Sequence, residues 1–132
     1  MKLVNLSRLP QETKNEVANK YVLDLLRTKE GFSINANLGT PKGGYMVGGF
    51  GYHLELDKNI NRDLLRMFIS EVMEQIKKDN TLYLGGWYDS DKGIFEVEIS
   101  RNILNLAPSL LKAIINKQKF IYDIANDKDI KV

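Results

Sequence analysis

A glycine-rich stretch in the first half of the chain has a composition that suits either phosphate binding or close backbone packing. Residues 39–53 read GTPKGGYMVGGFGYH, with six glycines. The stretch contains no G-x-x-x-x-G-K-[ST] phosphate loop, and Gly49-Phe50-Gly51 lacks the third glycine and the following helix of a dinucleotide-binding turn. A turn over 40–44 followed by a strand from Tyr45 fits better. Glycines inside a strand mark a bulge, tight packing or the close approach of a ligand, and these interpretations stay open.

One imidazole and a few carboxylates are the groups best suited to acid–base or metal chemistry. His53 is the only histidine, and no G-x-S-x-G nucleophile elbow accompanies it. Glu96 and Glu98 share one face of a predicted strand, and with Asp89 and Asp91 nearby they can bind a hard cation or act as an acid–base pair. The simpler interpretation is that both glutamates face water while the apolar residues between them face the core. Because a full catalytic set is hard to assemble, we expect no catalytic residues and no metal.

Aromatic and cationic residues beside bare glycine backbone suggest ligand binding. Gly85-Gly86 directly precede Trp87, the single tryptophan. Trp87 can stack on a nucleotide base, which is worth about 1–3 kcal/mol, anchor an oligomer interface, or pack in the core. Arg101 can clamp a phosphate or lie solvated at a strand end. The candidate ligand-binding residues are Lys42, Tyr45, Trp87, Tyr88, Arg101 and Asn102.

The hydrophobic pattern predicts the helices and strands that position these groups. Helical spacing predicts helices over 10–27 and 62–78, with Asn61 as N-cap of the second, and a third helix opening at Pro108. Alternation predicts strands over 31–35, 45–57, 82–88, 94–100 and 119–124, with 129–132 pairing to the last. Hairpin-linked strands separated by helices favour an α+β fold, an antiparallel-rich sheet covered by about three helices in the order αββαββαβ(β).

Length and composition limit the classes of protein to consider. The 132 residues fit a single domain, 1–132, with an N-terminal helical segment (1–30) and a sheet-and-helix core (31–132). There is no cysteine, so disulfides and thiolate metal sites are excluded. A net charge of +2 is too balanced for strong nucleic-acid binding. No apolar run resembles a signal peptide or membrane span, so we expect a soluble intracellular protein without membrane contact.

Several motifs, in this order, resemble those of a family of small proteins encoded by phages and prophages. They are Gly31-Phe32-Ser33-Ile34-Asn35, Pro41-Lys42-Gly43-Gly44-Tyr45-Met46-Val47, Leu84-Gly85-Gly86-Trp87-Tyr88, Phe95-Glu96-Val97-Glu98-Ile99-Ser100, and residues 116–124, NKQKFIYDI. The likeness spans roughly residues 31–130 and extends to the phage anti-Thoeris sponges. It departs at Tyr88-Asp89 and at the glycine-rich residues 48–52. Such sponges sequester cyclic ADP-ribose-type signals without chemistry, often in a pocket between subunits.

The resemblance implies a phage-type anti-defence protein that acts in the host cytoplasm. We expect it to bind and sequester a nucleotide-derived immune signal without catalysis or cofactor, as a homo-oligomer, either a dimer or a higher assembly. One alternative is a protein-directed inhibitor of host defence, such as an anti-CRISPR. A second is a small metal-dependent phosphodiesterase or nuclease that uses Glu96, Glu98 and the Asp89/Asp91 loop.

Overall fold

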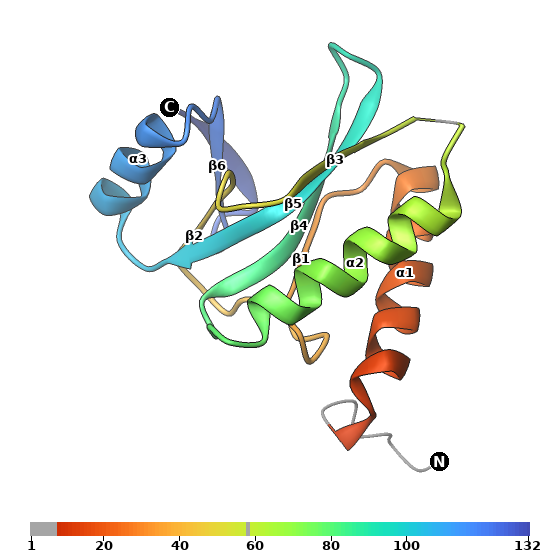
Figure 1. Ribbon diagram of the computed structural model, residues 1–132. Helices are drawn as coiled ribbons and strands as arrows, with labels where there is room; N and C mark the ends of the chain where they lie inside the picture. The colour runs from red at the N-terminus through yellow and green to blue at the C-terminus, as the bar shows by residue number, and fades with distance from the viewer. Residues whose placement is uncertain (1–7, 58) are drawn as a thin grey trace.

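The computed structural model describes residues 8–57 and 59–132, which form one antiparallel sheet of seven strands and three helices (Figure 1). The predicted α+β class is confirmed. Along the chain the elements are α1 (Gln11–Thr28), β1 (Phe32–Ile34), β2 (Tyr45–Val47), β3 (His53–Leu56), α2 (Arg62–Ile76), β4 (Leu82–Asp89), β5 (Ile94–Ile103), α3 (Leu106–Ile115), β6 (Phe120–Asp123) and β7 (Lys128–Lys131). None of the described helices is long and apolar enough to cross a membrane.

The ten-residue strand β5 lies at the centre of the sheet and organises its neighbours. The strand order is β1-β4-β5-β2-β6-β7, and β3 pairs with β5 on the same side as β2. β3 pairs with residues 95–98 of β5, whereas β2 pairs with residues 101–103. The strand predicted over 45–57 is therefore two short strands that share one long partner.

Helices α1 and α2 lie side by side and cover one face of the sheet near β4 (Figure 1). The predicted stripe of α2 is buried at Leu65, Ile69, Val72 and Ile76. Its N-cap is also confirmed, because the side chain of Asn61 accepts a hydrogen bond from the Leu64 N–H at 3.0 Å. These side chains pack against alternate residues of β5, namely Phe95, Val97 and Ile99. The opposite face of β5 is thereby directed away from the helices.

Two details of the helices differ from the sequence-based expectation. In α1, Val22 and Leu25 of the apolar stripe are buried as the helical spacing predicts, whereas Val17 and Tyr21 of the same stripe are exposed and Ala18 is buried. α3 begins at Leu106 rather than at Pro108. It packs Ala113 against Val47 and Ile121 at the far end of the sheet from α2, and leaves much of its apolar surface exposed (Figure 1).

Candidate functional site

A groove of about 910 Å³ runs over the sheet face opposite α1 and α2 and extends past β1 to Tyr21, Lys29 and Tyr88 on the helix side. Strand alternation places Trp87 of β4 and Glu96, Glu98 and Ser100 of β5 on this face, and all four line the groove. Small-molecule sites commonly enclose about 300–1,000 Å³, so the groove has the size of a ligand site.

The glycine-rich segment forms one wall of this groove as a bulge between β2 and β3. It stays attached to β5, because Phe50 N–H donates to Ile99 O at 3.1 Å and Ile99 N–H donates to Tyr52 O at 3.2 Å. Gly49 has a φ of +83°, which favours glycine. The structural interpretation of the stretch, a bulge, is therefore confirmed. Its glycines also line the groove, and the close approach of a ligand stays a prediction.

Glu98 lies where this bulge contacts the floor of the groove. Its carboxylate accepts a hydrogen bond from the Gly49 N–H at 3.2 Å. A side chain at Gly48 would place its Cβ only 2.0 Å from Glu98 Oε1, so glycine leaves the space that the carboxylate occupies. Burial raises the pKa of Glu98, while the His53 imidazole and the Gly49 N–H act in the opposite direction. The protonated form of Glu98 is therefore favoured relative to an exposed glutamate.

Ser100 supplies a buried hydroxyl beside Glu98. The residue is 5% exposed, and its Oγ has no hydrogen-bond partner among the described residues. Gly85 lies alongside, since a Cβ there would be 2.9 Å from this oxygen. Buried polar atoms are almost always paired, so the Ser100 hydroxyl needs a hydrogen-bond partner that the described residues do not supply.

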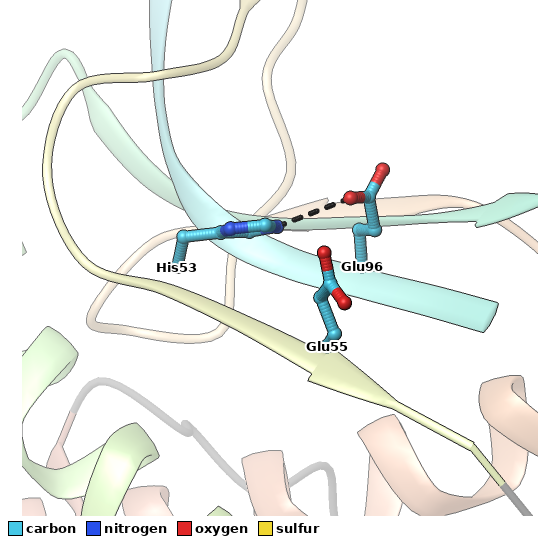
Figure 2. A group of neighbouring side chains, drawn as sticks. All are labelled: His53, Glu55 and Glu96. Atoms are coloured by element: carbon cyan, nitrogen blue, oxygen red, sulfur yellow. Dashed lines mark ion pairs between the residues drawn. The ribbon is translucent and has the colours of Figure 1, made fainter. Parts of the chain in front are cut away.

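His53, Glu55 and Glu96 form a cluster at the β3 end of the face. Their side chains point toward one another from two neighbouring strands, and His53 Nε2 lies 3.3 Å from Glu96 Oε1 (Figure 2). One ligand atom from each residue lies within 4.8 Å of the others. Glu96 is 8% exposed, so the interpretation that both strand glutamates face water is wrong for this residue. The pleat does place Glu96 and Glu98 on the same face, as the alternation predicts.

Asp89 and Asp91 have a local role in the β4–β5 hairpin. The Asp89 carboxylate accepts hydrogen bonds from the backbone N–H groups of Asp91 at 3.1 Å and Lys92 at 3.3 Å. This arrangement satisfies the loop backbone. It occupies Oδ1, one of the two oxygens of the Asp89 carboxylate that the sequence suggested as a cation ligand.

The two neighbouring aromatic candidates face opposite sides of β4. Trp87 is 38% exposed and lines the groove. Tyr88 also lines the groove, but it packs on the helix side against the core, where Lys29 Nζ lies 4.8 Å from its ring centroid. Because adjacent strand residues alternate, Trp87 and Tyr88 cannot stack on the same face of one ligand.

The other candidate binding residues are not gathered around Trp87. Arg101 lies over the Phe50 ring at 5.0 Å and donates a hydrogen bond to Thr81 Oγ1 at 3.3 Å. Tyr45 packs with the α3 cluster. Asn102 donates to Gly43 O at 2.8 Å, which ties the turn to β5, and Lys42 in that turn is exposed. Of the six predicted binding residues, Trp87 and Tyr88 line the groove, on opposite faces of β4. The groove lining does not include Arg101, Tyr45, Asn102 or Lys42.

Sequence reasoning did not single out Ser100 or the rim lysines Lys117 and Lys119 as ligand contacts, although all three line the groove. The sequence pattern could have identified Ser100, because it continues the alternation of Glu96 and Glu98 along β5 and so shares their face. No local signal marks Lys117 and Lys119, since only the pairing of β6 with β2 brings their segment to this face.

Comparisons with protein-family models, curated proteins and solved structures find no match to this chain. The resemblance to phage proteins therefore remains a prediction from the sequence motifs.

Proposed function

We propose that this protein binds a nucleotide-derived small molecule in the groove and holds it chemically unchanged. In this proposal it is a phage-type anti-defence protein that withholds an immune signal of the cyclic ADP-ribose kind in the host cytoplasm. The observation that carries the binding proposal is the unpaired, buried Ser100 hydroxyl in a groove of small-molecule size.

The groove offers complementary chemistry for each part of a nucleotide. Trp87 presents an exposed ring on which a base can stack. Glu98 and Ser100 can accept hydrogen bonds from sugar hydroxyls, and the bare backbone of Gly85 leaves room for close approach. Lys117 and Lys119 at the opposite rim supply cations for phosphates. This assignment replaces Arg101 with the rim lysines as the phosphate contact.

The arrangement favours sequestration over covalent catalysis. An activated serine needs a base within hydrogen-bonding distance, yet Ser100 Oγ has no partner among the described residues. The single imidazole instead lies beside Glu96. Binding without turnover therefore requires no group beyond those that line the groove.

Ligand capture tests the proposal directly. The purified protein is incubated with a nucleotide extract from phage-infected bacteria, recovered by filtration and heat-denatured, and the released compounds are identified by mass spectrometry. We expect one intact nucleotide-derived compound that a Trp87→Ala variant captures less well. Release of no nucleotide, or equal capture by the variant, would argue against this function.

A metal-dependent phosphodiesterase is the second candidate, because His53, Glu55 and Glu96 converge. Chromatography separates the two functions. Incubation of cyclic ADP-ribose with the protein and a divalent cation leaves the nucleotide intact under the sequestration proposal. A product that accumulates in proportion to protein concentration would show that the protein hydrolyses the nucleotide rather than sequestering it.

A further inference from the structure

The pairing of β3 with β5 creates an electrostatic conflict at one point of the open face. Glu55 lies directly opposite Glu96 in the register, and His53 lies opposite Glu98. Like charges directly opposite on a sheet are destabilising. The two carboxylates thus need a positive partner between them.

The imidazole of His53 meets this need only in part. Its Nε2 lies 3.3 Å from Glu96 Oε1, slightly longer than the usual 2.7–3.2 Å range of an N–H···O hydrogen bond. The Glu96 side chain is only 11% exposed, and buried charges in proteins are paired or coordinate metals. Glu96 therefore presents a desolvated carboxylate toward a nitrogen ligand and a second carboxylate.

We propose that His53, Glu55 and Glu96 bind a divalent transition-metal cation, with Zn²⁺ as the representative ion. The three ligand atoms lie within 4.8 Å of one another. Bonds of about 2.0–2.2 Å at a tetrahedral angle place two ligand atoms about 3.4 Å apart, which matches the His53–Glu96 separation. Figure 2 shows the imidazole and both carboxylates directed into one space.

The donor set also selects the class of cation. An imidazole nitrogen with carboxylate oxygens suits zinc and similar ions, whereas Mg²⁺ and Ca²⁺ prefer sites built from oxygen alone. Three protein ligands leave a coordination position open, and the His53 side chain is 44% exposed. His53 and Glu96 also line the groove, so a cation held by them would lie beside it. The cation would there offset the negative charge of the carboxylates on the floor of the groove. It would also bind an anionic group of a small molecule in the groove.

Calorimetry with Zn²⁺ alone tests the site without any nucleotide. The full chain, treated with chelator and exchanged into metal-free buffer, is titrated with zinc chloride, and Mg²⁺ and Ca²⁺ serve as comparison ions. We expect one Zn²⁺ per chain and weaker binding of the other two. His53→Gln and Glu55→Gln should each weaken Zn²⁺ binding by at least about tenfold, since even the outer-shell partners of metal ligands are worth 10–100-fold.

The variants are chosen so that the fold survives. His53 and Glu55 are both exposed, and circular dichroism checks each variant. Glu71→Gln, an exposed residue on α2, removes the same charge away from the cluster and should bind Zn²⁺ as the wild type does. Equal Zn²⁺ affinity in all three variants would place the ion elsewhere and overturn the proposal. So would the absence of Zn²⁺ binding to the folded wild type, or preferential binding of Mg²⁺ or Ca²⁺.

Discussion

The carboxylate of Glu98 accepts a hydrogen bond from the backbone N–H of Gly49 at 3.2 Å, at the bulge between β2 and β3. This contact joins the glycine-rich segment to the central strand and directs the carboxylate into the groove wall. It explains why the glycines are there. Gly48 makes room for the carboxylate, and Gly49 adopts the left-handed conformation that presents its N–H.

Gly49→Ala should lower the free energy of unfolding by about 1–2 kcal/mol, because a side chain disfavours the left-handed conformation. The φ of +83° is the source of this strain, and the added Cβ would also lie 2.8 Å from Gln118 Nε2. Urea unfolding measures the change. Gly43→Ala, where a Cβ meets nothing within 4 Å, should stay within about 0.5 kcal/mol of wild type. Equal effects of the two substitutions would show that the bulge is not strained.

Trp87→Ala should weaken binding of cyclic ADP-ribose by about 1–3 kcal/mol if the indole stacks on the base. Calorimetry provides the measurement. Because Trp87 is 38% exposed, the loss should come without a large change in stability. Tyr52→Ala is the matched control, since Tyr52 is an aromatic residue 48% exposed outside the set of groove residues. Weakened binding in the Tyr52→Ala variant alone would show that the base stacks on Tyr52 rather than on Trp87.

Arg101→Ala should lower stability by about 1 kcal/mol and leave nucleotide affinity unchanged. The guanidinium stacks on Phe50 and lies 3.5 Å from Asp79 Oδ2, on the helix side of the sheet. Arg101→Lys keeps the charge and loses the planar stacking, so it should recover only part of the stability. Urea unfolding and calorimetry report the two quantities. A large loss of nucleotide affinity with unchanged stability would show that Arg101 contacts the ligand.

Tyr122 should give the protein a pH-dependent stability in the alkaline range. A hydrogen bond to the Asp127 carboxylate raises the pKa of Tyr122 from 10.0 to about 12. Since the folded pKa lies above the unfolded value, the stabilisation is complete below 10 and is lost as the pH rises toward 12. Wild type should therefore exceed Tyr122→Phe in stability at neutral pH, and the difference should shrink near pH 12. A difference that grows with pH would contradict this sign.

The homo-oligomer expected from the sequence remains a prediction, and the structure suggests α3 as its contact surface. The free sheet edges are short, with β1 three residues long and β7 four. By contrast, Leu111, Ile114 and Ile115 on α3 are 59%, 62% and 60% exposed, and contiguous exposed apolar surface commonly marks an interface.

Light scattering at micromolar concentration tests this assembly. We expect a dimer that Leu111→Glu and Ile115→Glu convert to a monomer. Met67→Glu, at an apolar residue 66% exposed on α2, should leave the dimer intact. A monomeric wild type would refute the prediction, and a dimer that survives the α3 changes would place the interface elsewhere.

Local patterns in the sequence determined the elements and the face of each strand residue. The apolar stripe and the Asn61 cap defined α2, because helical periodicity and capping depend on residues within one or two turns. Alternation placed Glu96 and Glu98 on one face for the same reason. These features need no information about distant parts of the chain.

Tertiary structure decided how those faces combine. Only the pairing of β3 and β5 shows that Glu55 opposes Glu96, and only the β4–β5 register shows that Trp87 and Arg101 face opposite sides. Periodicity orders residues within a strand, but the register between strands depends on contacts far apart in sequence. The burial of Glu96 and the exposure of α3 likewise follow from what packs over each surface, which no local pattern specifies.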